Sequence, residues 1–444
     1  MKTPIYDFVR EYSSSESVRL HMPGHKGVGR LGCEALDITE ICGADVLYSA
    51  TGIIGESEDN ASRLFGSGKT LYSTEGSTLA IKAMLALATK GKGEHPLLLA
   101  GRNAHKAFLY SAALLDFDIE WLYSKENGHV CSSGITADDV KEAVLSLERK
   151  PVAVYITSPD YLGNVLDVKS IAEVCDEFDI PLLVDNAHGA YLAFLEPSQH
   201  PISLGATMCA DSAHKTLPVL TGGAYLHIAR EKEELIKESE WAMSIFASTS
   251  PSYLTLESLD LCNQYLSDGY KDRLSAFIER VSLTKQSLKN MGYDVVDTEP
   301  LKIVISALER DYSGFELAEH LSTRGIELEF SDRDFAVMML TPENGEGALL
   351  ALERALFEFD SKDRCCKRKY IPAQTRPKTA ISIRNAVFSK SETIPSDRAL
   401  GRICATPTVS CPPAVPVIVS GEVVDASVIE TLKYYGLSEI SVVK

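Results

Sequence analysis

Four short stretches of the chain combine residues that could act together on a small molecule. Thr74–Thr78 reads Thr-Glu-Gly-Ser-Thr, whose hydroxyls and backbone amides could hold an anion, and Arg102–His105 ends in an imidazole. Asp185–Gly189 supplies a carboxylate and a second imidazole. Asp211–Thr216 reads Asp-Ser-Ala-His-Lys-Thr and supplies an amine, which can form a covalent bond with a carbonyl group.

Each of these stretches follows a segment that is predicted to be a buried strand. The chain has strand-like Leu71–Ser73, and longer apolar runs predict strands at Leu97–Ala100, Val152–Thr157, Pro181–Val184, Thr207–Ala210 and Ala224–Ile228. Helices are predicted between them, at Ser77–Thr89 and as a crossover at Ile171–Phe178. Apolar strands that alternate with helices are typical of a mostly parallel sheet covered on both faces.

In such a sheet the carboxyl ends of the strands meet at one edge, where loops carry reactive residues without disturbing the core. We therefore expect the four polar stretches to converge. Together they supply a phosphate cradle, a neighbour for a flat ring, a buried carboxylate and an amine. Pyridoxal phosphate (PLP) needs this set of groups, so the sequence predicts a PLP site.

Further motifs run along the chain in a fixed order: His21–Gly27, Asp37–Glu40, the Gly76–Thr78 turn, Arg102–Lys106, Asp185–Ala190, Ser212–Leu217, Ser248–Leu254, and Gly401–Ile403 with a Pro-rich run after it. In this order they resemble the Orn/Lys/Arg decarboxylase family, in its short form, almost end to end. The resemblance implies an α/β chain with the fold-type-I PLP-dependent transferase fold. In that fold a mostly parallel sheet flanked by helices is joined to smaller α/β C-terminal domains.

The resemblance assigns the central chemistry to Lys215 and Asp185. Lys215 would form the Schiff base with PLP, since a desolvated lysine amine can be deprotonated and then exchanged for the substrate amine. Asp185 would bind the pyridine nitrogen and keep it protonated, so that the ring accepts electrons from the substrate. A helix cap is the alternative role for Asp185.

The resemblance also implies the remaining cofactor contacts. These are Gly76, Ser77, Thr78, Ser212 and His214 around the phosphate, His188 near the phenolic oxygen, and His105 stacked on the ring. His105, with Lys215 and Asp185, is expected to be catalytic. Capping of a helix would by itself explain Ser77.

The expected reaction is decarboxylation of arginine, lysine or ornithine to the amine and carbon dioxide. Asp160, with Glu75 behind it, is the candidate to bind the far cation of the substrate. Three departures from the family pattern bear on the choice of amino acid: Glu75 before Gly76, Asp160 in place of a more usual Thr, and Ala405-Thr406 where many relatives have Ala-Glu.

Two other patterns look functional at first sight. Gly66–Thr70 resembles the end of a P-loop. However, Arg63 occupies the position where the pattern requires its first glycine, and a strand follows instead of a helix. His21 and His25 have metal-like spacing, but Pro23 and Gly24 between them preclude a helical ligand pair. We expect the segment around them to lie on the substrate side of the site.

Composition excludes several classes of protein. The 62 acidic and 44 basic residues give a net charge of -18, which argues against nucleic-acid binding. The ten cysteines lack C-x-x-C spacing, so neither a metal site nor a disulfide framework is predicted. With no signal peptide and no apolar run of about 18 residues, we expect a cytoplasmic protein without a membrane partner.

We predict four parts along the chain: an N-terminal arm at 1–35, a large PLP-binding domain at 36–265, a small α/β domain at 266–360, and a C-terminal decarboxylase-family domain at 361–444. A basic 361–380 stretch reads as a linker. By analogy with the fold type, we expect a homodimer or higher homo-oligomer.

Two other functions remain open. The chain could catalyse another fold-type-I reaction, as an aminotransferase or a lyase, or bind PLP without turnover. The leading expectation is an amino-acid decarboxylase that takes part in polyamine biosynthesis.

Overall fold

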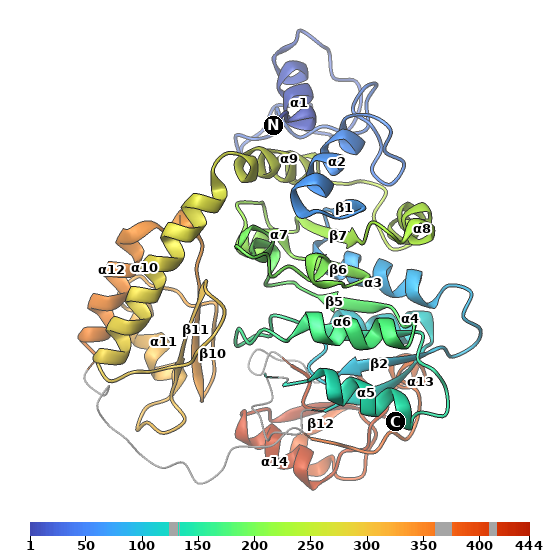
Figure 1. The fold of residues 1–444 in the computed structure, drawn as a ribbon, viewed down its shortest axis with the longest axis vertical. Coiled ribbons are helices and arrows are strands. Elements are labelled where there is room, and N and C mark those ends of the chain that lie inside the picture. Colours follow the sequence, from blue (N-terminus) through green and yellow to red (C-terminus); the bar gives the residue numbers. More distant parts are fainter. Residues whose placement is uncertain (124–131, 133, 360–374, 408–414) are drawn as a thin grey trace. The chain divides into compact units, whose positions relative to one another are not determined.

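The computed structural model describes residues 1–123, 132, 134–359, 375–407 and 415–444, and these form two compact units (Figure 1). The first unit comprises Met1–Lys90 and Cys175–Leu274. The second comprises Gly91–Val174 and Ser275–Lys444. The domain boundaries predicted from the sequence remain a prediction.

The first unit is built on four strands in the order β1-β7-β6-β5. Their bounds are β1 Lys69–Ser73, β5 Leu182–Asp185, β6 Met208–Asp211 and β7 Ala224–Ile228. β5 is parallel to β6, whereas β7 is antiparallel to both β6 and β1. It follows that β1, β5 and β6 run in the same direction and end at the same edge.

Helices and short 3-10 turns complete the first unit: α1 Pro4–Ser14, α2 Ile53–Phe65, α3 Gly76–Thr89, η1 Ala190–Phe194, η2 Pro201–Leu204, α7 Ala213–Thr216, α8 Glu233–Ser244 and α9 Tyr253–Ser267. α3 packs on β6 and β7 and is apolar nearly all round, with buried residues from Leu79 to Ala88. A helix with this composition belongs in a core. α6 (Val168–Glu177) and α10 (Tyr270–Asn290) span the boundaries between the units.

The second unit contains three sheets. Parallel β4-β2-β3 consists of β2 Leu97–Gly101, β3 Asp118–Leu122 and β4 Ala153–Thr157. An antiparallel sheet in the order β10-β11-β9-β8 consists of β8 Asp294–Val295, β9 Lys302–Ser306, β10 Phe330–Ser331 and β11 Phe335–Met339. β12 (Ser391–Pro395) pairs with β13 (Glu439–Val443).

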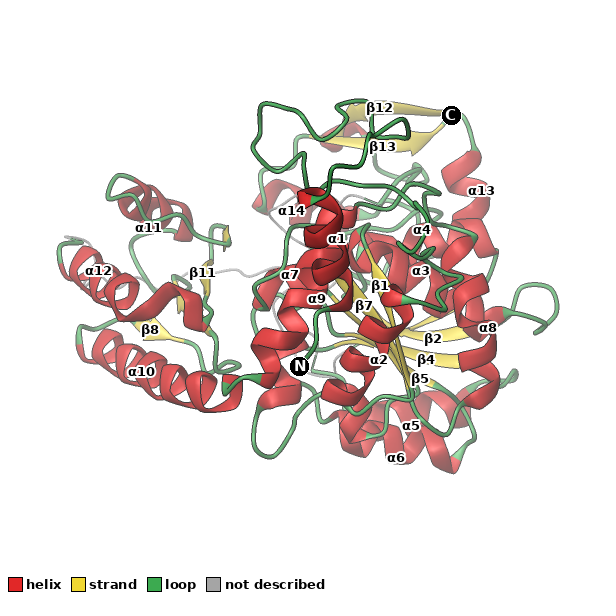
Figure 2. Cartoon of the chain, turned by 90° about the horizontal axis from the view of Figure 1, so that it is seen from above, coloured by secondary structure: helices red, strands yellow, loops and turns green. Residues whose placement is uncertain are grey.

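The helices of the second unit are α4 Lys106–Leu115, α5 Ala137–Ser146, α11 Gly314–Ser322, η3 Pro342–Asn344, α12 Gly345–Phe357, α13 Ile383–Phe388, η4 Ser396–Arg398 and α14 Ala426–Tyr434. In Figures 1 and 2, α10, α11 and α12 lie alongside the sheet that contains β11. Capping boxes fix the starts of α5 and α11. They are formed by Thr136 and Asp139 in α5 and by Ser313 and Glu316 in α11.

The predicted α/β fold class is confirmed, and the strands predicted from apolar runs are all present. β3 and β12 had no signal in the sequence. Both have polar, partly exposed residues, such as Glu120 in β3 and Glu392 in β12, so neither forms an apolar run. Part of the predicted linker, 360–374, lies outside the described residues.

The P-loop interpretation of Gly66–Thr70 is excluded by the structure, as expected from the sequence. Gly66 has φ +69° and ends α2, and β1 begins at Lys69. The Lys69 amine lies 3.2 Å from a carboxylate oxygen of buried Glu58. This lysine therefore has a structural partner, because it compensates the charge of a buried carboxylate.

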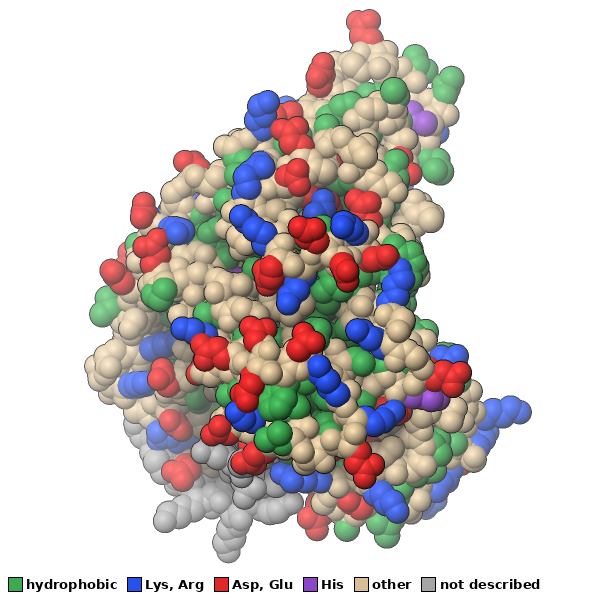
Figure 3. All heavy atoms as spheres, turned by 45° about the vertical axis from the view of Figure 1, so that its right-hand side comes forward, with side chains coloured by type: hydrophobic (Ala, Val, Ile, Leu, Met, Phe, Trp, Pro, Cys, Tyr) green, Lys and Arg blue, Asp and Glu red, His purple; other side chains and the backbone are tan. Residues whose placement is uncertain are grey.

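Acidic and basic side chains are interspersed on the face drawn in Figure 3, without a continuous basic patch there. Within the described ranges no helix has both the length and the apolar character that crossing a membrane requires.

Two glycines of the second unit test its packing. A Cβ on Gly314 would lie 2.1 Å from the Phe335 carbonyl oxygen and 2.4 Å from that of Asp332, whereas a Cβ on Gly347 in α12 meets nothing within 4 Å. We expect Gly314→Ala to lower the free energy of unfolding by about 1–3 kcal/mol. Gly347→Ala should raise it by roughly 0.5–1 kcal/mol, because alanine favours the helix. Urea denaturation of both variants checks this, and equal stability would contradict the packing described.

Candidate active site

The turn between β1 and α3 presents the start of a helix to the edge of the sheet. Gly76 has φ +72°, a conformation that glycine adopts at little cost. Its N–H donates to the Gly222 carbonyl at 2.7 Å, and the Ser73 hydroxyl donates to the Gly76 carbonyl at 2.9 Å. Helix geometry leaves the N–H groups of Ser77 and Thr78 without acceptors inside α3. Together with the helix dipole, these groups make the turn suitable for binding an anion.

The loop that carries the lysine is tied directly to this turn. The Ser212 hydroxyl, just after β6, donates to the Ser77 hydroxyl at 2.7 Å. His214 Nδ1 lies 2.9 Å from the Gly223 carbonyl, next to the glycine that accepts from Gly76. The Gly76 turn and the lysine loop therefore form one hydrogen-bonded assembly.

Lys215 lies beside a histidine from the loop that follows β5. Its amine is 2.8 Å from His188 Nε2; the lysine is half-buried and the histidine is buried. A hydrogen bond between two nitrogens needs a lone pair on one of them, so the two groups cannot both be fully protonated. A proton can thus be held between an amine and an imidazole at this point.

Asp185 ends β5 and is only 2% exposed. One of its carboxylate oxygens, Oδ1, accepts from the Ala187 N–H at 3.2 Å. The carboxylate therefore organises the turn toward His188. It caps no helix, because the next helical element, η1, begins at Ala190 with Gly189 as its N-cap. This contact involves a single oxygen and is compatible with a second role for the carboxylate.

A buried network lies behind this loop and was not recognised in the sequence. The Asn186 amide donates to Asp211 Oδ1 at 2.7 Å, and the other oxygen of Asp211 lies 3.0 Å from His200 Nε2 and 3.3 Å from His227 Nε2. Burial alone would raise the pKa of Asp211, but the two imidazoles lower it below its ordinary value. The only local signal was the period of two that puts Cys209 and Asp211 on one face of β6.

Three of the predicted site residues, Glu75, His105 and Asp160, make hydrogen bonds other than those that join the Gly76 turn to the lysine loop. Glu75 is exposed, and its Oε1 accepts from the Ser248 N–H at 2.7 Å. His105 and Asp160 belong to the second unit. His105 caps α4 by accepting from the Ala107 N–H at 3.2 Å, and both carboxylate oxygens of buried Asp160 accept from Asn164, at 2.9 and 2.8 Å.

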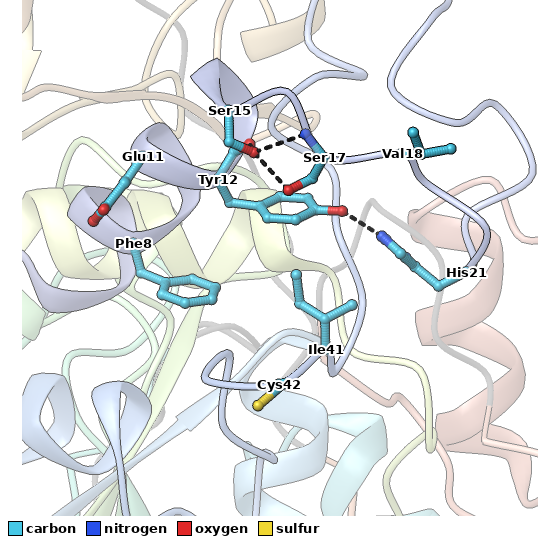
Figure 4. A pocket seen from close by; sticks show the side chains of 9 residues that line it. All are labelled: Phe8, Glu11, Tyr12, Ser15, Ser17, Val18, His21, Ile41 and Cys42. Carbon is cyan, nitrogen blue, oxygen red and sulfur yellow. Dashed lines mark hydrogen bonds between the residues drawn. The ribbon is translucent and has the colours of Figure 1, made fainter.

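His21 lines a pocket next to α1, together with residues such as Phe8 and Tyr12 (Figure 4). The Tyr12 hydroxyl lies 2.6 Å from His21 Nε2, and His25 Nε2 lies 3.1 Å from a carboxylate oxygen of Asp37. Each histidine thus has its own hydrogen-bonding partner.

Comparison with known proteins gives consistent matches over the whole chain. A family model described as Orn/Lys/Arg decarboxylase, major domain, matches residues 3–308, and one for the C-terminal domain of the same family matches residues 362–440. The uncharacterized protein YaaO of Bacillus subtilis is 29% identical over 95% of this chain and 92% of its own length. An arginine decarboxylase of Halalkalibacterium halodurans is 29% identical over 96% and 92%.

Solved structures show a similar fold. The constitutive lysine decarboxylase of E. coli superimposes with a TM-score of 0.80 at 19% identity, covering 100% of this chain and 82% of its own. A lysine decarboxylase of Francisella novicida gives a TM-score of 0.83 at 16% identity, covering 100% and 81%.

Two glycines at opposite ends of α3 test whether its N-terminus binds an anion. Gly76 and Gly91 have φ values of +72° and +71°, and a Cβ on either meets nothing within 4 Å. Alanine at either position costs about 1–2 kcal/mol of strain, so thermal stability should fall similarly in both variants. Only Gly76→Ala should also weaken binding of inorganic phosphate, by about tenfold if the strain must be restored on binding. Thermal-shift titration with phosphate measures this; equal phosphate affinity in the two variants would exclude the turn as the anion site.

Proposed function

The chain belongs to the Orn/Lys/Arg decarboxylase family of PLP-dependent enzymes, and on that premise we propose that it removes the α-carboxylate of a basic amino acid as carbon dioxide. Arginine is our first candidate substrate, because arginine decarboxylases of two bacilli are 29% identical over at least 95% of this chain. Lysine and ornithine are the alternatives. The amine produced would enter polyamine biosynthesis, and we propose a cytoplasmic homo-oligomer.

The observation that carries this proposal is the contact of 2.8 Å between the Lys215 amine and His188 Nε2, at the edge where β1, β5 and β6 end. The residues of the first unit fit PLP. An amine, a buried carboxylate and a helix N-terminus lie at the ends of three strands that share one direction. These are the groups that an aldehyde, a pyridine nitrogen and a phosphate require.

We assign each group of the cofactor to residues of this chain. Lys215 would bond to the aldehyde carbon. The first-turn amides of α3, with the hydroxyls of Ser77 and Ser212, would hold the phosphate, and Asp185 would bind the pyridine nitrogen. The histidines predicted from the sequence complete the set: His188 at the phenolic oxygen, His105 on the ring face and His214 near the phosphate.

Bound PLP supplies an electron sink for the pair left at the α-carbon when carbon dioxide leaves. The residues of the chain provide binding and protons. The charge of buried Asp185 would keep the pyridine nitrogen protonated, since an ion pair in a low-dielectric site favours the charged form. The Lys215 amine, 2.8 Å from His188 Nε2, would share a proton with that imidazole and deliver one to the α-carbon.

For the far cation of the substrate we favour Glu75 over Asp160. Glu75 is exposed beside the Gly76 turn, with one oxygen bonded to the Ser248 N–H. Asp160 is buried, and its two carboxylate oxygens both accept hydrogen bonds from Asn164. A carboxylate fixed in this way is a poorer partner for an incoming guanidinium or ammonium group.

Lysine 215 can be tested directly as the attachment point. Borohydride reduction of the purified enzyme should leave a pyridoxyl group on the peptide that contains Lys215, as measured by mass spectrometry. Lys215→Ala should lose the adduct and lower kcat at least about a thousandfold, equivalent to about 4 kcal/mol of transition-state stabilisation. Lys237→Ala, which changes an exposed lysine of α8, should behave as wild type. An adduct that persists in Lys215→Ala would refute the assignment.

The reaction type can be tested with arginine, lysine and ornithine in heavy water. We expect one of them to give stoichiometric carbon dioxide and the corresponding amine with one deuterium at the former α-carbon, because one solvent proton replaces the carboxylate. PLP labilises the bond that the protein holds perpendicular to the ring, so the product reports this orientation. A keto acid product would instead indicate an aminotransferase. Bound cofactor without turnover of any of the three would favour a binding protein.

A further inference from the structure

Four side chains that commonly bind metals meet in the core of the first unit. They are His200, Cys209, Asp211 and His227, and each is 0% exposed. Cys209 and Asp211 are two residues apart on β6 and therefore point to the same face. His227 on β7 is paired with Cys209 across the sheet, and His200 stands immediately before η2. Three separate segments thus bring together the ligand atoms of His200, Cys209 and Asp211, with His227 beside Asp211.

The separations of these donor atoms are close to those in a metal site. His200 Nε2 and His227 Nε2 lie 3.0 and 3.3 Å from Asp211 Oδ2, and Cys209 Sγ lies 3.8 Å from His200 Nε2. Two ligands at zinc–ligand distances of 2.0–2.3 Å, with tetrahedral angles, are about 3.3–3.6 Å apart. His200, Cys209 and Asp211, whose ligand atoms lie within 4.8 Å of one another, are therefore close to ligand spacing. His227 lies against Asp211 and has to move further toward the other two side chains to share the same ion.

The contact of His227 with Asp211 is longer than a usual hydrogen bond. Its buried Nε2 lies 3.3 Å from Asp211 Oδ2, outside good hydrogen-bond geometry. Its other nitrogen, Nδ1, lies 2.8 Å from the Thr70 hydroxyl, which is in turn 2.7 Å from the Ser67 hydroxyl. A histidine that binds a metal through one ring nitrogen is usually held by a hydrogen bond at the other, as here.

Asp211 is arranged in the same manner. Its Oδ1 accepts from the Asn186 amide at 2.7 Å, while Oδ2 faces both imidazoles. One oxygen is thus held by an outer hydrogen bond and the other is directed to the centre of the cluster. This is the arrangement expected of a carboxylate that binds a metal through a single oxygen.

The surroundings favour a site with no net charge. The Phe65 ring packs on His227 and His200, with centroid separations of 4.5 and 5.5 Å, and buried Tyr225 lies against His227. Burying an uncompensated charge in such an apolar environment is costly. A divalent cation with one thiolate, one carboxylate and two neutral imidazoles has a total charge of zero.

We propose that His200 Nε2, Cys209 Sγ, Asp211 Oδ2 and His227 Nε2 together bind one zinc ion. Mixed nitrogen, sulfur and oxygen donors suit zinc, and four protein ligands leave no open position, so the ion is structural. Binding displaces the thiol proton of Cys209 to solvent. The ion connects β6, β7 and the segment before η2, beneath the loops that follow Asp185 and Asp211. This site is independent of the proposed decarboxylation.

The metal content of the purified full-length protein tests the proposal. Mass spectrometry of the elements should find about one zinc per chain in protein prepared without chelators. Cys209→Ser and His227→Gln should each contain at least about tenfold less zinc, whereas Cys175→Ser, which changes another buried cysteine, should retain it. Absence of zinc from the wild type, or equal zinc in all variants, would overturn the proposal.

A second measurement applies if the ligand variants do not fold. Wild-type protein produced in zinc-poor, cobalt-supplemented medium should show the visible bands of tetrahedral cobalt and a thiolate-to-cobalt charge-transfer band. Cys175→Ser should show the same spectrum. Protein that folds in this medium without a thiolate–cobalt band would mean that the cluster is held by hydrogen bonds only. Neither readout depends on turnover, so an inactive enzyme with full zinc would contradict the proposed function alone.

Discussion

The common direction of β1, β5 and β6 is the constraint on which the candidate active site depends. β7 lies between β1 and β6 and is antiparallel to both. As a result, β1 runs in the same direction as β6 and β5. The Gly76 turn, the Asp185 loop and the Lys215 loop therefore leave the sheet at the same edge. If β7 were antiparallel to only one of these two neighbours, β1 would be reversed and the Gly76 turn would emerge at the opposite edge from the lysine.

Strand direction brings the loops to one edge, and hydrogen bonds between the loops then fix their relative positions. The Ser212 hydroxyl joins the lysine loop to the phosphate turn, and the Asn186 amide joins the Asp185 loop to Asp211. Both Ser212 and Asp211 are at the end of β6, so one strand terminus positions both neighbours. Catalytic groups need to be held within a fraction of an ångström, and such second contacts supply that rigidity.

The same strand end separates two environments. Lys215 and His188 lie at the edge, where the lysine is half-buried and can exchange protons and partners. Cys209 and Asp211, a few residues earlier, are in a dry interior against aromatic rings, where charge must be neutralised locally. An amine at the sheet edge and a buried cluster of His, Cys and Asp side chains thus occupy one short segment in separate environments.

The sequence by itself determined the family, the α/β fold class and the apolar strands, because each depends on short-range patterns: motif order and hydrophobic period. It also excluded a P-loop, because Arg63 stands where the first glycine is required and strand-like Leu71–Ser73 follows. Polar edge strands such as β3 carried no such pattern. Only the tertiary structure decided that the two carboxylate oxygens of Asp160 accept hydrogen bonds from Asn164, and that Lys302, distant in the chain, bonds to its carbonyl. It alone brought His200 and His227 to Asp211, since strand register and packing, which no local spacing encodes, determine which distant side chains meet.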